Sequence, residues 1–292
     1  MLSIVESQIR AVLEAASNDE PVEIDPAKFE AAGREFGEKL KEQFGQKDRS
    51  FKLRMSNIGR PACQLQLEKA GSPRERFPYN HVVRMLIGDA VEIITRLAME
   101  AAGVNVTSNG DQTELDVDGV RIKGTSDIDI DGAVWDIKSC SPWAFQNKWN
   151  KGFEGLLQSD DFGYIGQLYG YADAQGKKPG GWIVVDKSSG EIAIVPVEAD
   201  QNVEKSIRQQ RKETIKAVVN DEPFRRWFEP QEEYYRKKKT GKYIVAKECS
   251  FCPFIRTCWP KAQYKASEDS TAKTPPKKWY LEAQDVDLSV FC

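Results

Sequence analysis

The stretch VRIKGTSDIDIDGAVWDIKS, residues 120–139, decides the fold of this chain. Apolar and polar residues alternate on both sides of Asp131-Gly132, a pair typical of the two-residue turn in a β-hairpin. Pairing around that turn sets Ile128 opposite Trp135, with further apolar residues on the same side of the hairpin. The stretch therefore predicts two antiparallel strands with one apolar face and one polar face.

The polar face of this hairpin concentrates negative charge. The same register sets Asp127 opposite Asp136 and leaves Asp129 and Lys138 on that face. Opposed carboxylates about 5 Å apart at their Cβ atoms repel each other, so we expect a positive group beside them. Mg²⁺ would resolve the conflict, because it takes carboxylate oxygens as ligands and keeps other positions for water and substrate phosphate.

Lys138 adds a cation to this predicted metal site. A lysine there can position an attacking water, or deprotonate it as the neutral amine, and as an ammonium it offsets the charge of a scissile phosphate. Two alternatives stay open from the hairpin alone. One is a solvated polar face that carries only a Lys–Asp pair. The other is a retaining glycosidase, whose two carboxyl groups lie about 5 Å apart, although the lysine and the cysteine-rich C-terminal part do not suit it.

On both sides of this hairpin, the spacing at which apolar residues recur changes along the chain. Short alternating runs predict further strands, and capping signals followed by a helical apolar period predict helices. Helices are expected over residues 1–20, 26–44, 56–71, 80–103, 161–175 and 200–219, and strands over 104–109, 113–119, 120–132, 133–139, 181–187 and 191–197. This order predicts an α/β fold with a mixed central β-sheet flanked by helices.

Composition limits the classes of function. The 292 residues are 40% hydrophobic and 30% charged without a long apolar run, which predicts a globular, cytoplasmic protein with no membrane span. The formal net charge of −3 argues against coating of nucleic acid by bulk charge, so any DNA binding must be local. We expect a helical extension over residues 1–55, a core over 56–262 and a flexible tail over 263–292.

Four short motifs follow one another through this expected core. They are Gly88-Asp-Ala-Val-Glu92, Gly124-Thr-Ser-Asp127, Asp136-Ile-Lys138 and Gln167-Leu-Tyr-Gly-Tyr171. Their order and spacing resemble the PD-(D/E)XK nucleases of the RecB type, except that the first has glutamate where the family's G-x-x-x-H motif has histidine. The resemblance implies a restriction-endonuclease-like core that hydrolyses DNA phosphodiesters with Mg²⁺ or Mn²⁺.

The resemblance also implies which residues bind the catalytic metal. These are Glu92, Asp127, Asp136 and the main-chain carbonyl of Ile137, with Asp89 a weaker candidate beside Glu92. Glutamate in place of histidine keeps a side chain that can ligate a metal. The departure leaves the choice between Mg²⁺ and Mn²⁺ open.

The remaining motif residues are expected to act on water and substrate. The resemblance implies that Lys138 assists the attacking water. Gln167 and Tyr171 lie four residues apart, so both project from one face of the expected helix, where they would orient Lys138 and the substrate. His81 fits no motif position, and we expect it to be a partly exposed residue at the start of a helix.

Three cysteines within a short loop predict a metal or cluster site. Cys249-x2-Cys252-Pro253-x4-Cys258 supplies three thiolates, and Cys63 is the candidate for the fourth ligand that such sites need. Spacing alone leaves zinc and iron–sulfur open. One cysteine before the core and C-x2-C-x5-C after it resemble the iron–sulfur nucleases, namely the AddB-type recombination nucleases and the exonuclease of CRISPR adaptation. The resemblance implies a [4Fe-4S] cluster that ties the two ends of the core together.

Basic residues gather with aromatic residues in the C-terminal third of the chain. One cluster covers residues 205–216, a second is Arg225-Arg226 beside Trp227-Phe228, and a third is 236–239 beside Tyr234, Tyr235 and Tyr243. Such mixtures hold single-stranded nucleic acid, because bases stack on rings while cations follow the phosphates. The alternative for each cluster is a solvated helix face.

Together these features predict a metal-dependent DNA exonuclease. The family resemblance implies action on single-stranded ends in recombination, repair or phage DNA metabolism. The alternative is a non-catalytic DNA-binding or scaffold subunit with a structural iron–sulfur or zinc site. The intact Asp136-Ile-Lys138 motif argues against that alternative.

The C-terminal tail carries a further short motif. Asp287-Leu-Ser-Val-Phe291 resembles the peptide by which bacterial enzymes dock on the replication sliding clamp, with aspartate in place of the usual glutamine. The resemblance implies that Leu288 and Phe291 enter a hydrophobic pocket of the clamp. A tail that packs on its own domain or stays unordered is the alternative. Cys140 and Cys292 are not assigned to the cluster.

Overall fold

The computed structural model describes residues 2–46, 48, 50–109 and 112–282. The chain divides into two compact units, each built from segments that are far apart in sequence. Unit 1 takes residues up to 58, 77–159 and 164–209, and unit 2 takes residues 59–76, 160–163 and those from 210 onward. The expected N-terminal extension is therefore part of unit 1, and the expected core contributes to both units.

Two expectations concern parts of the chain that the fold does not test. The clamp-like motif Asp287–Phe291 and Cys292 lie outside the described residues.

Among the residues that are described, no helix combines the length and the apolar character needed to cross a membrane.

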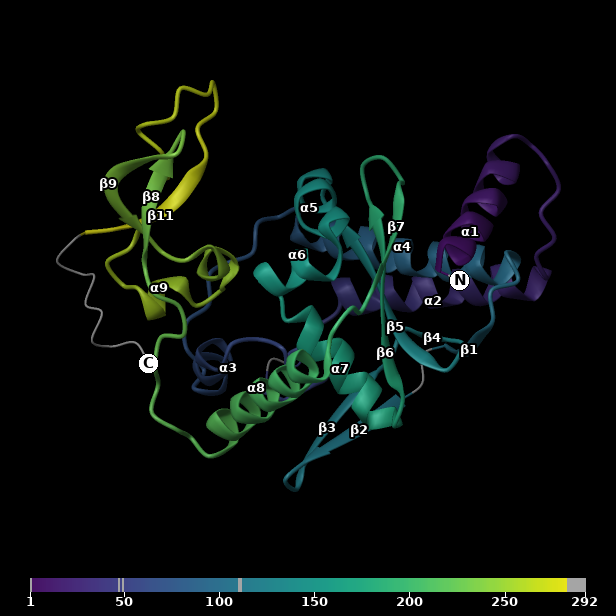
Figure 1. Ribbon diagram of the computed structural model, residues 1–292, viewed down its shortest axis with the longest axis horizontal. Coiled ribbons are helices and arrows are strands. Elements are labelled where there is room, and N and C mark those ends of the chain that lie inside the picture. The colour runs from purple at the N-terminus through teal and green to yellow at the C-terminus, as the bar shows by residue number, and fades with distance from the viewer. Residues whose placement is uncertain (1, 47, 49, 110–111, 283–292) are drawn as a thin grey trace. The chain divides into compact units, whose positions relative to one another are not determined.

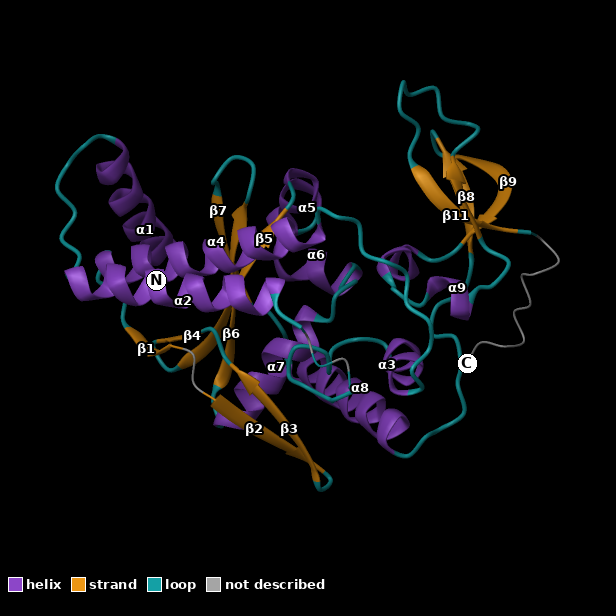
Figure 2. Ribbon diagram, turned by 180° about the vertical axis from the view of Figure 1, so that it is seen from behind, coloured by secondary structure: helices purple, strands orange, loops and turns teal. Residues whose placement is uncertain are grey.

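A mixed five-stranded sheet forms the centre of unit 1 (Figures 1 and 2). Its strand order is β1-β4-β5-β6-β7, in which β5 and β6 are parallel and the other neighbours are antiparallel. The strands are β1 (Val106–Asn109), β4 (Ile128–Ile130), β5 (Ala133–Cys140), β6 (Lys178–Asp186) and β7 (Ile192–Pro196). Helices connect β5 to β6, because parallel neighbours need a long crossover. The expected α/β class with a mixed sheet is confirmed.

The β4–β5 hairpin has the register expected from the sequence. Ile128 lies opposite Trp135, and the turn residues Asp131 and Gly132 have φ angles of 50° and 79°. Positive φ at both central positions is the requirement of a type I′ turn, which Asp-Gly tolerates well. Local turn chemistry therefore fixes which side chains of β4 and β5 share a face.

Helices cover both faces of this sheet. Helices α1 (Leu2–Ser17), α2 (Pro26–Phe44) and α4 (His81–Ala101) pack together, with α1 against β7 and α4 against β5. Helices α5 (Pro142–Asn147), α6 (Gly152–Gln158) and α7 (Tyr164–Gln175), with the 3₁₀ turn η1 (Trp149–Lys151), belong to the β5–β6 crossover. Successive side chains of β6 point to opposite faces of the sheet. Ile183 packs in the cluster with α1 and α4, whereas the Trp182 ring stacks with the Phe153 ring of α6, with ring centroids 6.2 Å apart.

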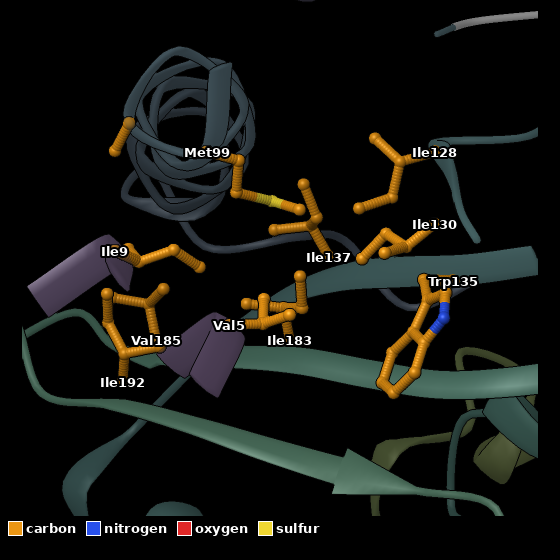
Figure 3. Close-up of a cluster of buried hydrophobic side chains, with 11 residues drawn as sticks. Val5, Ile9, Met99, Ile128, Ile130, Trp135, Ile137, Ile183, Val185 and Ile192 are labelled. Atoms are coloured by element: carbon orange, nitrogen blue, oxygen red, sulfur yellow. The ribbon is translucent and has the colours of Figure 1, made fainter. Parts of the chain in front are cut away.

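The core between α1, α4 and the sheet explains why the first helix belongs to unit 1. Val5 and Ile9 of α1 are buried with Met99 of α4 against Ile137 and Ile183, as Figure 3 shows. Burying each such side chain contributes about 1.5–3 kcal/mol. The amphipathic N-terminal helix is thus a structural layer of the unit.

A second hairpin leads into the segment that carries Asp127. Strands β2 (Gln112–Val117) and β3 (Val120–Thr125) pair as a two-stranded sheet. Asp118 and Gly119 form their turn with φ angles of 51° and 86°. The chain passes from β3 directly to Asp127, which precedes β4. Both Asp-Gly turns expected from the sequence are therefore present.

Unit 2 contains a four-stranded sheet that the sequence did not predict. Its order is β10-β11-β9-β8, with β8 (Gln231–Tyr235), β9 (Lys238–Ile244), β10 (Gln263–Ala266) and β11 (Lys277–Leu281). The flexible tail expected from residue 263 is thus wrong as far as Leu281. Trp279 and Leu281 are buried with Val245 and Trp259, so this polar segment is held by a few large apolar residues.

The helices of unit 2 also differ from expectation at one point. They are α3 (Ala62–Lys69), η2 (Lys247–Phe251) and α9 (Ile255–Cys258), while α8 (Gln201–Val219) spans the division between the units. The helix expected to open at Ser56-Asn57 begins only after Pro61. Asn57 instead accepts a hydrogen bond from the Arg54 amide at 2.9 Å, which closes a turn.

Glu233 holds the sheet of unit 2 together from within. Its carboxylate is fully buried and accepts hydrogen bonds from Lys278 (2.8 Å), Tyr280 (2.7 Å), Ser267 (3.1 Å) and Thr240 (3.0 Å). Burial alone raises the pKa of a carboxyl group, but these donors outweigh it and lower the pKa of Glu233 to about 2. One charged group therefore links β8, β9, β11 and the loop after β10.

We expect Glu233→Gln to lower the free energy of unfolding by about 1–3 kcal/mol at neutral pH, because the donors lose their anionic acceptor. The pKa of Glu233 is depressed on folding, so its contribution is present above the unfolded pKa of about 4.3 and is lost as the pH falls toward 2. The difference from wild type in urea denaturation should shrink over that window. Glu232→Gln, on the neighbouring position, should change little, and equal losses in both variants would contradict the assignment.

Candidate functional site

An ion pair at the middle of β5 forms the centre of the candidate site. Lys138 Nζ lies 2.6 Å from Asp136 Oδ1, and the Asp136 side chain is only 3% exposed. Asp136 Oδ2 is buried and has no hydrogen-bond partner among the described residues. Asp127 Oδ2 accepts a hydrogen bond from the Ile137 amide at 2.9 Å. The hairpin thus brings Asp127, Asp136, Ile137 and Lys138 together, as the sequence predicts.

Helix α4 brings Glu92 to the same site. Glu92 and Asp127 line one cavity, together with Glu35, Lys39, Arg96, Thr125 and Ser126. Arg96 Nη1 donates to Glu92 Oε1 at 2.9 Å, and Arg96 also pairs with Glu35 of α2. Sequence reasoning missed Arg96, although its position four residues after Glu92 on a helix gave the signal. Glu92 is therefore held by a buried guanidinium.

The electrostatics show the conflict between carboxylates that the sequence predicts. Burial raises the pKa of Asp136 well above its usual range, Lys138 opposes the shift, and Asp127 adds to it. Burial and Asp127 also raise the pKa of Glu92 to about 7, against the effect of Arg96. Burial lowers the pKa of a lysine, but Asp136 and Asp127 raise the pKa of Lys138 above its ordinary value. A site with this balance favours an added cation.

Gln167 and Tyr171 lie on α7 as expected, but they contact each other. The Gln167 side chain hydrogen-bonds to the Tyr171 hydroxyl, and burial together with Asp127 raises the pKa of Tyr171 to about 12. The aromatic ring beside Lys138 belongs to Tyr164, with Nζ 5.5 Å from the ring centroid. Lys148 Nζ lies at the same distance from that ring. Tyr164 precedes Gln167 by three residues and Tyr171 by seven, a helical spacing that sequence reasoning overlooked.

Three other sequence candidates have structural partners. Asp129 is fully buried and pairs with Lys177, so it does not join the Asp136–Lys138 pair. Asp89 lies 3.4 Å from the Gln43 amide nitrogen. The His81 ring stacks on Phe77 with centroids 4.0 Å apart. Lys177 and Gln43 come from segments whose proximity a sequence pattern does not reveal, whereas Phe77 lies only four residues before His81.

The four predicted cysteines line one cavity within unit 2. Cys63 comes from α3, Cys249 from η2, and Cys252 and Cys258 from the segment through α9. Arg226 donates two hydrogen bonds to the Cys258 carbonyl, at 3.1 and 3.0 Å, and its side chain also hydrogen-bonds to the Cys258 sulfur. The structure therefore brings the distant Cys63 to the cysteine loop.

The thiols have the surroundings of metal ligands. Burial, and then neighbouring cysteines, raise the pKa of Cys63 to about 12, while burial raises the pKa of Cys258 to about 11. The Trp227 amide donates to the Cys63 sulfur, and the Phe254 amide donates to the Cys252 sulfur. Thiolates that repel one another in a buried cavity, yet receive N–H donors, fit a cationic group bound between them.

Neither site has its ligands in a bound arrangement. Within the described ranges, no three His, Cys, Asp or Glu side chains are already placed to hold a metal ion. The carboxylate oxygens are directed instead to Lys138, Arg96 and the Ile137 amide. Cys140, on β5 of unit 1, is buried and does not line the cysteine cavity, and burial raises its pKa to about 12.

Comparisons with known proteins show no family for this chain. No family model matches the chain, and no curated protein matches it. A similar solved structure is titled "Crystal structure of SSO0001"; it has a TM-score of 0.43 and 16% identity, over 80% of this chain and 98% of that chain.

The first residue of the Gly124-Thr-Ser-Asp127 motif has a packing role that can be tested. A Cβ at Gly124 would lie 2.5 Å from Met55 Cβ and 2.9 Å from Tyr171 Cε1. We expect Gly124→Ala to cost about 1–3 kcal/mol of unfolding free energy and to displace Tyr171, because close-packed neighbours cannot absorb the added methyl. Gly37→Ala on α2, where nothing lies within 4 Å, should be neutral or stabilising in the same thermal denaturation.

Proposed function

We propose that this chain is a metal-dependent DNA exonuclease of the PD-(D/E)XK type that acts on single-stranded ends in DNA recombination, repair or phage DNA metabolism. The observation that carries the proposal is the buried Asp136–Lys138 pair beside Asp127 and Glu92. Burial and Asp127 raise the pKa of both Asp136 and Glu92, and one buried oxygen of Asp136 has no hydrogen-bond partner among the described residues, so an added metal ion would stabilise the group.

The topology around this pair also supports the proposal. The hairpin β4–β5, the helical crossover with α7, and the parallel strand β6 follow α4 in the order expected of a restriction-endonuclease-like core. Each motif then reaches the site from a different element. Glu92 comes from α4, Asp127 precedes β4, Asp136 lies on β5 and Tyr171 lies on α7.

The residues present fit Mg²⁺ or Mn²⁺. Glu92, Asp127, Asp136 and the Ile137 carbonyl would hold the ion, all through the oxygen ligands that these cations prefer. When bound, the metal would supply Lewis acidity to the phosphoryl group. The chain's own carboxylates would fix its position, with Arg96 keeping Glu92 turned toward Asp127 rather than into solvent.

Lys138 would act on the phosphate and the attacking water. Its ion pair with Asp136 marks it as an ammonium, so it donates hydrogen bonds to a phosphate oxygen or to the water. Hydrolysis forms a bond from water oxygen to phosphorus and breaks the bond to the leaving sugar oxygen, which takes a proton. Tyr164 limits the directions that Lys138 can take, because the ring lies against its ammonium.

We expect Asp136→Asn and Lys138→Met each to reduce cleavage of end-labelled single-stranded DNA at least about a hundredfold with Mg²⁺ or Mn²⁺, since each removes transition-state stabilisation. Asp127→Ala should behave alike. The matched control is Asp131→Asn in the turn of the same hairpin, where asparagine tolerates positive φ and activity should persist.

Melting temperatures of all four variants separate lost chemistry from lost fold. Rates near wild type in Asp136→Asn or Lys138→Met would refute the proposed site. A wild-type protein that binds single-stranded DNA without cleaving it under any of these conditions would favour a non-catalytic binding subunit.

We also propose that the cysteine cavity of unit 2 holds a [4Fe-4S] cluster with a structural role. Four thiols that line one cavity, three of them with N–H donors directed at the sulfur, suit such a cluster, and a tetrahedral zinc site is the competing occupant. The ligands come from α3 and from the segment after β9, so the group would join two chain segments that are distant in sequence.

Anaerobically purified protein should contain about four iron atoms per chain and show the brown colour of a cysteine-ligated cluster. We expect Cys63→Ser and Cys252→Ser to lose the iron and to melt at lower temperature, because ligand binding is coupled to folding. Cys140→Ser, in unit 1, should keep the full iron content. Stoichiometric zinc without iron would reject the cluster, and equal iron in all three variants would reject the ligand assignment.

A further inference from the structure

Two of the three basic clusters expected to bind DNA are occupied by structural contacts. Arg208 pairs with Asp173 and Glu204 and lies 5.0 Å above the Tyr169 ring, and Arg211 is buried. Arg226 is bound to the Cys258 carbonyl and stacks on Trp259. These arginines therefore stabilise the fold through contacts within the protein.

The third cluster forms the tip of the β8–β9 hairpin in unit 2. Arg236, Lys237, Lys238 and Lys239 are all exposed there, next to Tyr234, whose surface is 53% exposed. Lys239 pairs with Glu232. Within the described part of the chain, neither Lys237 nor Lys238 has a carboxylate partner. The tip therefore presents two uncompensated ammonium groups beside an open aromatic ring.

The backbone at this tip is strained. Arg236 and Lys237 have φ angles of 48° and 66°, the left-handed conformation that a type I′ turn requires at both central positions. Among the described residues, the other two turns with positive φ at both central positions use Asp-Gly, at 118–119 and 131–132. Two long cationic residues pay about 1–2 kcal/mol each for a conformation that Asn-Gly adopts freely. Strain that a better turn sequence would remove points to a function of these side chains.

The rest of unit 2 holds this strained tip in place. The Tyr235 hydroxyl and the Arg236 guanidinium both contact Thr271 Oγ1, at 2.9 and 3.1 Å, and the Thr271 amide donates to Tyr235 at 3.1 Å. Behind them, Glu233 is locked among its four donors. The cations are thus displayed on a fixed support, which lowers the entropic cost of binding an extended polyanion.

We propose that the β8–β9 hairpin tip is a binding surface for single-stranded DNA. Lys237 and Lys238 contact successive phosphates, Arg236 adds a third cation, and Tyr234 stacks on a base. The inference rests on the proposed nuclease function for its choice of DNA. It assigns unit 2 a part in substrate binding in addition to the proposed cluster.

The test removes the two ammonium groups while improving the turn. Lys237→Gly supplies the residue preferred at positive φ, Lys238→Thr suits a strand, and Arg236 keeps its contact with Thr271. We expect the double variant to melt no lower than wild type. Its affinity for labelled oligothymidine, measured with Ca²⁺ in place of Mg²⁺, should fall about tenfold, and the salt dependence of binding should weaken by about 1.4, or about 0.7 for each lost phosphate contact.

The matched control is Lys242→Gln with Lys265→Gln, which removes the same net charge from the same sheet. Both lysines pair with Glu268 in the structure, so their loss should leave affinity and salt dependence nearly unchanged. Tyr234→Ala should weaken binding without altering the salt dependence, because stacking releases no counterions.

Equal affinity and equal salt dependence in wild type and the Lys237→Gly/Lys238→Thr variant would overturn the inference, as would equal losses in the charge-matched control. That outcome leaves the nuclease proposal standing if Asp136→Asn still abolishes cleavage. If the hairpin variant binds weakly while wild type cleaves no DNA, the surface is supported and the nuclease proposal fails.

Discussion

The burial of Asp136 beside Lys138 is the constraint on which unit 1 depends. A carboxylate removed from water costs several kcal/mol unless a cation and hydrogen bonds replace its solvation. Lys138 supplies only part of that compensation, because one oxygen of Asp136 remains unpartnered. The strands on both sides of β5 and the helices over the sheet keep this carboxylate out of water.

The two units solve the problem of a buried carboxylate in opposite ways. In unit 2, Glu233 receives four donors, and its charge is fully satisfied by the protein. In unit 1, Asp136, Asp127 and Glu92 are crowded together with too few donors. Satisfied carboxylates stabilise a fold, whereas under-satisfied ones are typical of sites that bind something else. The contrast is between a carboxylate whose hydrogen bonds the fold supplies and a group of carboxylates that it leaves short of donors.

Local signals carried most of the fold of unit 1 in the sequence. Asp131-Gly132 fixed the register of β4 and β5, and Asp25-Pro26 marked the start of α2, where Asp25 accepts from the Ala27 amide at 2.9 Å. The motif residues were found because each lies at a fixed spacing on its own element. Arg96 and Tyr164 followed the same spacing and were missed. The strands between residues 231 and 281 were not predicted from the sequence. They are polar and bury only a few large residues, such as Trp279, so apolar and polar residues do not alternate clearly along them.

The interrupted path of the chain also bears on how the protein is made. Unit 2 takes two earlier segments, residues 59–76 and 160–163, and is completed only by residues from 210 onward. During synthesis, Cys63 leaves the ribosome long before Cys249, while every segment of unit 1 is complete by residue 209. Since domains tend to fold as they emerge, unit 1 can form first. Helix α3 then lacks most of the residues of its own unit until the chain through β11 is translated. The cysteine cavity is thus among the last parts of the nascent chain to close.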